Sequence, residues 1–184
     1  MFTQYTDILD HLVEADQAAT SFLHDIIPHT PFFDRFFTFL SVYGNSVVAW
    51  LIILLLLVIF EGKRHRKFPV YLLAATLTTF LFVELVLKNL YGRARPLLLN
   101  DTLLSVCPKS FSFPSGHAAV AFAAAFVFSR FDKKRAVFYY ILALLICISR
   151  IYLNCHYLAD ILGGMIVGIT IAKITTLLLR KYLN

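Results

Sequence analysis

The sequence carries little charge for its length. Asp, Glu, Lys and Arg make up 15% of its 184 residues, whereas 59% are hydrophobic and the mean hydropathy is +0.75. A typical soluble domain has about 25% charged residues. The composition therefore excludes an ordinary soluble protein, and the length is sufficient for one compact bundle of membrane helices. We expect a single integral-membrane domain over residues 1–184.

Signals of several other protein classes are also missing. The net charge of +6 is not concentrated in an aromatic-basic patch and no zinc-ligand spacing occurs, so we expect no nucleic-acid partner. Asp7 and Asp10 stand where a cleavable signal peptide would have a basic segment, so a signal peptide is not expected. Cys107, Cys147 and Cys155 show no metal-ligand spacing, and we expect neither a metal nor a cofactor.

The sequence does contain apolar runs long enough to cross a bilayer. About 20 apolar residues cross its hydrocarbon core, and backbone in lipid has to bond internally, as a helix does. Residues 3–27 instead have apolar side chains at helical spacing and predict an amphipathic helix on the membrane surface. A partly ordered tail and a membrane crossing stay open as alternatives. The expected fold is an all-α polytopic membrane bundle of five to six helices. The predicted spans lie at roughly 36–60, 69–91, 114–130, 136–153 and 158–179.

Basic residues gather in the connections between these spans. The segments EGKRHRK (61–67) and RFDKKR (130–135) each hold four Lys or Arg, and the tail adds Arg180 and Lys181. If five helices alternate in direction, all three lie on one side, which the positive-inside rule places in the cytoplasm. Cys107 and Cys155 then fall on the outer side. Free thiols are the favoured expectation there, while a disulfide in an oxidising compartment stays open.

Three short polar strings interrupt the apolar chain. They are KNLYGRARP at 88–96, PSGH at 114–117 and SRIYLNCHYLAD at 149–160. Buried in lipid, their charged groups would be costly without a ligand or partner. The predicted topology brings all three strings to the outer end of the bundle, so we expect them to form one site.

The third string has the most specific chemistry. His156 and Asp160 are four residues apart, so at the start of a helix the carboxylate can reach the ring. A hydrogen bond to Nδ1 would leave Nε2 as a nucleophile. Arg150 could bind phosphate oxygens with two donors at once. The alternative is a structural His–Asp pair.

The first two strings predict anion binding less strongly. Pro114 suits the first turn of a helix. Ser112 or Phe113 would then be its cap, and the backbone N–H groups of residues 115–117 would be free for an anion. Lys88 could instead be a helix-end lysine that reaches toward the headgroups, paired with Glu84. For Arg93 we expect the role of a phospholipid anchor.

In their order and spacing, these strings resemble the type 2 phosphatidic acid phosphatase family, which includes membrane lipid phosphatases, glucose-6-phosphatase and vanadium haloperoxidases. The resemblance implies that His117 is the general acid, His156 the nucleophile and Asp160 its orienting partner. It implies phosphate binding by Lys88, Arg95, Ser115, Gly116 and Arg150.

The expected activity is metal-independent hydrolysis of a lipid phosphomonoester or pyrophosphate through a phosphohistidine. The resemblance further suggests a bacterial inner-membrane protein, with its site facing the periplasm or exterior. Undecaprenyl pyrophosphate, phosphatidylglycerophosphate, phosphatidic acid and lipid A 1-phosphate all remain candidate substrates. A lipid phosphotransferase and a non-catalytic bundle are the alternative functions, and the oligomeric state stays open.

Overall fold

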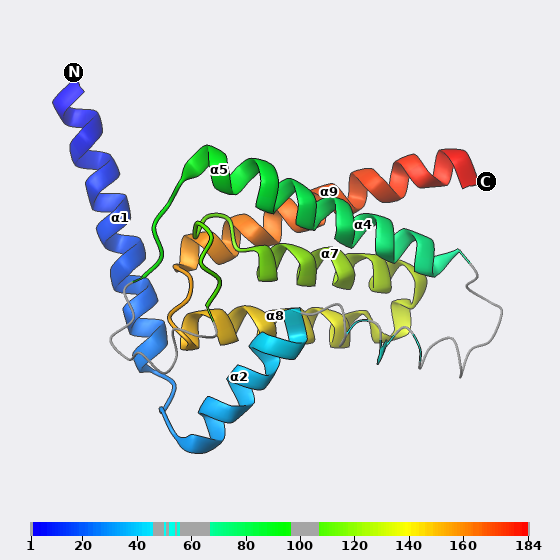
Figure 1. Cartoon of the computed structure of the whole chain (residues 1–184), viewed down its shortest axis with the longest axis horizontal. Helices are drawn as coiled ribbons and strands as arrows, with labels where there is room; N and C mark the ends of the chain where they lie inside the picture. The colour runs from blue at the N-terminus through cyan, green and yellow to red at the C-terminus, as the bar shows by residue number, and fades with distance from the viewer. Residues whose placement is uncertain are drawn as a thin grey trace.

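In the computed structural model the chain forms an all-helical bundle, described for residues 2–45, 50, 52–53, 55, 67–96 and 107–183 (Figure 1). These residues contain helices and connections but no strand. The helices are α1 (Phe2–Asp25), α2 (Pro31–Asn45), α4 (Phe68–Phe82), α5 (Lys88–Tyr91), α7 (Gly116–Phe131), α8 (Ala136–Tyr152) and α9 (Leu158–Leu183), with a π-helical turn at Val83–Leu87 and a 3-10 turn at Lys133–Arg135.

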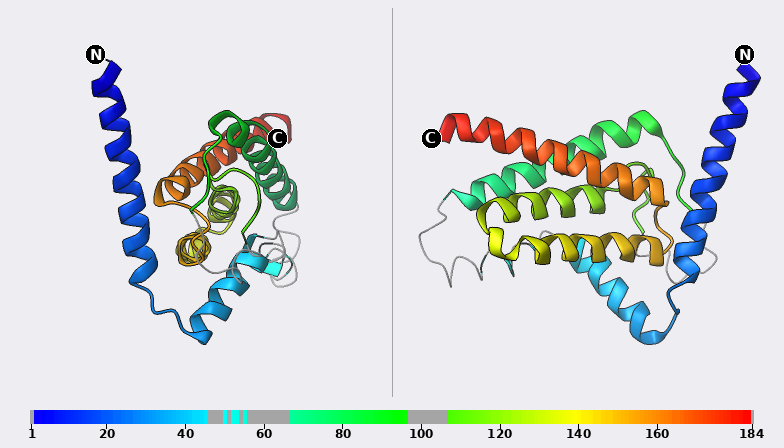
Figure 2. Two further views of the ribbon diagram at one scale, coloured as in Figure 1. Left: turned by 60° about the vertical axis from the view of Figure 1, so that its left-hand side comes forward. Right: turned by 180° about the vertical axis from the view of Figure 1, so that it is seen from behind.

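Helix α7 is the centre of the bundle, surrounded by α4, α8 and α9 (Figure 2). Its alanines are fully buried because only small side chains let helices approach so closely. The glycines of α9 likewise allow α9 to pack closely against α7. A Cβ atom on Gly164 would lie 2.5 Å from the carbonyl oxygen of Ser115, and one on Gly168 would collide with the backbone of Ala119.

Three helical stretches of the described chain are long and apolar enough to cross a membrane: Phe68–Tyr91, Lys133–Tyr152 and Leu158–Lys181. The intervening α7 is a shorter apolar helix. The large apolar side chains on their outer faces, such as Leu85, Ile141 and Ile166, are exposed, as expected of a surface that lies in lipid. The chain is an integral membrane protein.

The helix in which the first predicted span starts begins before residue 36. Helix α2 begins at Pro31, five residues before residue 36, because Thr30 caps it: the Phe33 N–H donates to Thr30 Oγ1 at 3.3 Å. The Thr-Pro pair was the available signal. The rest of that prediction, residues 46–60, lies mostly outside the described residues.

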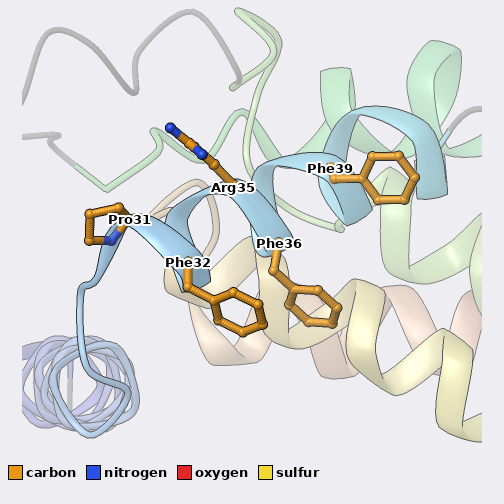
Figure 3. Close-up of a pocket in the computed structure, with 5 residues that line it drawn as sticks. All are labelled: Pro31, Phe32, Arg35, Phe36 and Phe39. Atoms are coloured by element: carbon orange, nitrogen blue, oxygen red, sulfur yellow. The ribbon is translucent and has the colours of Figure 1, made fainter.

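Helix α2 carries an open cavity of about 520 Å³, lined by Pro31, Phe32, Arg35, Phe36 and Phe39 (Figure 3). Phe32 and Phe39 are exposed there and Arg35 lies beside them. The opposite face of α2 packs on α8 through Phe37, which contacts Tyr152 with ring centroids 4.5 Å apart.

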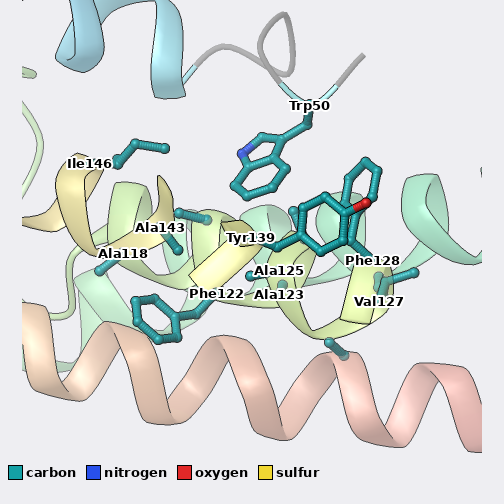
Figure 4. Packing of buried hydrophobic residues seen from close by; sticks show 14 of the residues in the cluster. Trp50, Ala118, Phe122, Ala123, Ala125, Val127, Phe128, Tyr139, Ala143 and Ile146 are labelled. Carbon is teal, nitrogen blue, oxygen red and sulfur yellow. The ribbon is translucent and has the colours of Figure 1, made fainter. Parts of the chain in front are cut away.

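The two ends of the bundle are built from different segments of the chain (Figure 1). One end holds the start of α4, the α7–α8 connection with Lys133 to Arg135, and the C-terminal end of α9 with Arg180 and Lys181. Next to it, Trp50 packs against Phe128, which in turn packs against Tyr139 of the buried core (Figure 4). The other end holds α5, the starts of α7 and α9 and the end of α8, and α1 runs across it.

Candidate active site

All three polar strings lie at the end of the bundle crossed by α1 (Figure 1). A π-helical turn, Val83–Leu87, directly precedes Lys88, and such turns often occur at functional sites. The helix then ends at Gly92, whose left-handed φ of 60° closes it. This turn directs the segment with Arg93 and Arg95 back over the end of α8 and the start of α9.

His156 lies at the centre of this cluster and is completely buried. Its Nε2 is 3.0 Å from Nη1 of Arg95, and its Nδ1 is 3.4 Å from Oδ2 of Asp160 and 3.3 Å from Oγ of Ser112. Because a guanidinium can only donate hydrogen bonds, Nε2 has to be the acceptor and Nδ1 carries the proton. This is the tautomer in which Nε2 can act as a nucleophile.

The surroundings keep this imidazole neutral. Burial, followed by the positive charges of Arg150, Arg95 and Lys88, lowers the pKa of His156 well below its usual 6.5. A neutral imidazole has a free electron pair on Nε2 at neutral pH.

The carboxylate of Asp160 has other partners besides His156, the partner that the sequence predicted. Oδ2 also accepts from Ser112 Oγ at 2.5 Å and from the Tyr157 N–H at 2.9 Å, and Oδ1 accepts from Arg93 Nη1 at 2.7 Å. The expectation that Arg93 anchors a phospholipid was therefore wrong. Its guanidinium turns into the protein, stacks over the Tyr157 ring at 4.1 Å and pairs with the carboxylate that faces His156.

Lys88 and Arg95 are held by one short segment, residues 110–111. Lys88 is buried, so it does not reach toward the headgroups, and its Nζ donates to Glu84 at 2.6 Å and to Ser110 Oγ at 2.8 Å. Arg95 donates to the carbonyl oxygens of Ser110 at 2.7 Å and Phe111 at 3.1 Å. Neither Ser110 nor Ser112 belonged to a predicted motif, although small polar residues next to PSGH were a weak signal.

Arg150 lies at the end of α8 and is fully buried. Its Nη1 donates to Ser41 Oγ of α2, whereas its Nε and Nη2 have no hydrogen-bond partner among the described residues. A buried charged donor without a partner is costly. The arrangement is therefore suited to an anion that accepts from these two nitrogens.

The start of α7 differs from the prediction. The helix begins at Gly116, and Ser115 is its cap, with Oγ accepting from the Ala118 N–H at 3.4 Å. The Ser115 N–H is not free, because it donates to the carbonyl oxygen of Asp160 at 2.9 Å. In the first helical turn, the N–H groups of Gly116 and His117 have no acceptor within the helix.

Gly116 and His117 face the charged groups of the other two strings. A Cβ atom on Gly116 would lie 2.8 Å from Oε1 of Glu84, so only glycine fits there without displacing that side chain. His117 is buried within electrostatic range of Lys88 and Arg150 as well as of His156. The cluster thus joins two imidazoles to several cations.

A disulfide joins Cys107 to Cys155, with Cα atoms 5.5 Å apart, so the favoured expectation of free thiols was wrong. The pairing depends on a contact between the loop before α7 and the α8–α9 turn, which spacing alone does not reveal. The bond fixes the segment with Ser110 and Ser112 next to His156. Cys147 is buried in α8 as a free thiol.

The sequence and the fold are similar to those of known proteins. A model of the PAP2 superfamily matches residues 68–183. The chain is 33% identical to an undecaprenyl-diphosphatase of Sulfolobus acidocaldarius over 71% of this chain and 63% of that protein, less than two thirds of its length. It is 28% identical to the undecaprenyl-diphosphatase BcrC of Bacillus subtilis over 81% of this chain and 76% of that protein.

Two solved structures share the architecture. The crystal structure of Aquifex aeolicus LpxE matches with a TM-score of 0.65 and 26% identity, over 87% of this chain and 93% of that one. A transmembrane PAP2 type phosphatidylglycerolphosphate phosphatase from Bacillus subtilis matches with a TM-score of 0.69, over 93% of this chain and 87% of that one. At 24% identity, the second likeness concerns the fold alone.

Proposed function

We propose, on the premise that this chain belongs to the PAP2 superfamily, that it is a lipid phosphatase that hydrolyses a phosphomonoester or diphosphate of a membrane lipid. One observation carries the proposal. A neutral, buried His156, with Nε2 as an acceptor and Nδ1 beside Asp160, lies among buried cations. Of these, Arg150 has two nitrogens without a partner among the residues that the structure describes. The cations can bind a phosphate, and the imidazole can attack its phosphorus atom.

The phosphate would be bound by Lys88, Arg95 and Arg150, together with the N–H groups of Gly116 and His117, which have no acceptor within α7. Three positive charges exceed the two negative charges of a phosphomonoester, which suits a transition state whose charge spreads over the equatorial oxygens. Arg95 now donates toward Nε2 of His156. On substrate binding it would turn to a phosphate oxygen and release the nucleophile.

The reaction would proceed in two steps. In the first, Nε2 of His156 forms a bond to phosphorus while the bond to the leaving oxygen breaks, and His117 donates a proton to that oxygen. In the second, water attacks the phosphohistidine, His117 removes a proton from the water, and the bond between nitrogen and phosphorus breaks. Inorganic phosphate leaves and the neutral imidazole is restored. Asp160 holds the Nδ1 proton throughout.

The site would face away from the cytoplasm. The opposite end of the bundle carries the basic connection at 130–135 and the basic tail, which the positive-inside rule assigns to the cytoplasm. The Cys107–Cys155 disulfide supports the same orientation, because disulfides persist in oxidising compartments. We therefore propose that the site lies at the outer surface of the membrane, and the family resemblance suggests that this is a bacterial inner membrane. A lipid could reach it there with its tail still in the bilayer.

The relatives suggest the class of lipid. Two of them are named for undecaprenyl diphosphate, and a 32% identical relative from Rhizobium etli is named a lipid A 1-phosphatase. All of these names describe a lipid with a phosphate or diphosphate head group. We propose undecaprenyl diphosphate as the first substrate to assay.

The test measures phosphate release from purified undecaprenyl diphosphate, lipid A and phosphatidylglycerophosphate in EDTA. The wild-type protein should release phosphate without an added acceptor, which separates hydrolysis from transfer to a second lipid. His156→Ala should lower the rate at least about 10³-fold. His11→Ala, at an exposed histidine of α1, is the matched control and should keep the full rate. Turnover by His156→Ala equal to that of the control would refute the proposed function.

A further inference from the structure

Helix α1 precedes the segment that the family model matches, yet its side chains cap the helix that carries Asp160. Oδ1 of Asp16 accepts from the Ala159 N–H at 2.9 Å, and Oγ1 of Thr20 accepts from the Leu158 N–H at 2.9 Å. These N–H groups open α9 and have no acceptor within it. A helix 138 residues away in the sequence thus supplies the N-terminal cap of α9.

The second oxygen of Asp16 extends this contact toward His156. Oδ2 of Asp16 accepts from Nη2 of Arg93 at 2.6 Å, and Nη1 of the same guanidinium donates to Oδ1 of Asp160 at 2.7 Å. The carbonyl oxygen of Arg93 accepts from the Ser112 N–H at 2.8 Å. Arg93 therefore lies between two carboxylates and is fixed through both its backbone and its side chain.

The two oxygens of Asp160 then have separate tasks. Oδ1 is taken by Arg93, so Oδ2 is the oxygen that faces Ser112 and Nδ1 of His156. Without Arg93, the fully buried Oδ1 would lose its charged donor, and the carboxylate could rotate toward other N–H groups. Asp16 balances the charge of Arg93, which keeps Asp160 a strong acceptor.

We propose that Asp16 and Arg93 are positioning residues for the His156–Asp160 pair, so that α1 is part of the active site. The inference rests on the proposed phosphatase function. Both residues act through Asp160 and neither contacts the phosphate. Their role is to hold one carboxylate oxygen on the imidazole during attack, which affects the chemical step more than the binding of substrate.

The experiment measures kcat and KM of the full-length protein in detergent micelles with undecaprenyl diphosphate. Asp16→Asn should lower kcat about tenfold and Arg93→Met about 100-fold, with KM changed less than about twofold, because supporting shells contribute effects of this size. Asp10→Asn and Glu14→Gln change exposed carboxylates of the same helix and should leave kcat unchanged.

The decisive comparison uses Asp160→Asn as background. If Asp16 and Arg93 act through Asp160, adding Asp16→Asn or Arg93→Met to Asp160→Asn should lower kcat less than about twofold further. Losses that stay additive in that background would overturn the inference and leave only a structural cap. Full activity of Arg93→Met would overturn it as well.

A further variant separates an effect on folding from an effect on catalysis. Arg93→Lys keeps the charge but cannot bond both carboxylates with one planar fork, so it should lose kcat at an unchanged melting temperature. If Arg93→Met does not fold, Arg93→Lys takes its place in the comparison with the Asp160→Asn background. Absence of phosphate release by the wild-type protein would instead contradict the proposed function. Loss in His156→Ala together with full activity of all Asp16 and Arg93 variants would contradict only the positioning role.

Discussion

Replacement of Arg150 by methionine should have opposite effects on stability and on anion binding. The guanidinium is fully buried, and its Nε and Nη2 have no partner in the described part of the chain. Methionine keeps a long, flexible side chain but removes the charge and every donor. If the two nitrogens are reserved for phosphate oxygens, the protein without an anion bears the cost of a charge whose partner has yet to bind.

The cost to stability follows from desolvation. Burying an ion costs several kcal/mol even after the protein relaxes, and Arg150 recovers part of this through its bond to Ser41. Replacing buried charges with apolar side chains of similar volume is often neutral or stabilising by about 1–4 kcal/mol. Without an anion, Arg150→Met should therefore unfold at the same or a higher temperature than the wild-type protein.

The loss in binding can be sized from the missing hydrogen bonds. A bond to a charged group contributes about 1.5–3 kcal/mol, so two bonds from Nε and Nη2 contribute about 3–6 kcal/mol. This corresponds to a roughly 10²–10⁴-fold weaker Kd for vanadate, which mimics five-coordinate phosphorus. Catalysis should fall at least as much, since the same donors bind the transition state.

The assay is thermal unfolding in detergent with and without vanadate, in EDTA. At 100 times its Kd, vanadate should stabilise the wild-type protein by about 2.7 kcal/mol and leave Arg150→Met unchanged at that concentration. Arg130→Met, at an exposed arginine near the other end of α7, should respond like wild type. The reasoning is refuted if Arg150→Met is less stable without an anion and binds vanadate as tightly as the wild-type protein.

Three further predictions test other features. Burial and nearby cations lower the pKa of His156, so the unfolded chain takes up a proton below pH 6.5 that the folded chain does not. The free energy of unfolding should therefore fall from pH 7 to pH 5, and it should fall less in His156→Gln. Equal falls in the two proteins would contradict this. Reducing the Cys107–Cys155 disulfide should lower the free energy of unfolding by about 2–4 kcal/mol in melting experiments. The double Ser variant should not respond to the reductant. Gly168→Ala should lower the melting temperature far more than Ile166→Ala, because a Cβ atom added at Gly168 would collide with the α7 backbone.

The coarse arrangement of the site could be predicted because membrane helices alternate in direction. Once the spans are known, their order along the chain is enough to assign each polar string to one of the two ends of the bundle. This placed Lys88, Arg150 and His156 together although 68 residues separate the first from the last. Gly164 and Gly168 are four residues apart, a spacing of small residues that is typical of a helix contact, and both lie against α7.

The contacts that complete the site could not be predicted, because each depends on where a loop or helix end finally lies. Ser112 bonds Asp160 across 48 residues, and Arg93 does so across 67. A serine before a proline or an arginine after a helix has many ordinary roles, such as a cap or a membrane anchor. The start of α7 was misplaced for a related reason: Pro114 was assigned to the first turn, whereas Ser115 both caps the helix and donates its own N–H to Asp160.

The segment before the family match has a specific consequence for related chains. Asp16 and Thr20 of α1 cap α9, and Ser41 of α2 holds the guanidinium of Arg150, so residues outside 68–183 contact the elements that bear the motifs. In the proposed mechanism the motifs supply the reacting groups, but a buried carboxylate or guanidinium keeps its orientation only while its other atoms are bonded. A chain with the same three strings and a different first helix would therefore need another partner for Arg93. Grafting the first 30 residues of such a chain should lower kcat while KM stays the same.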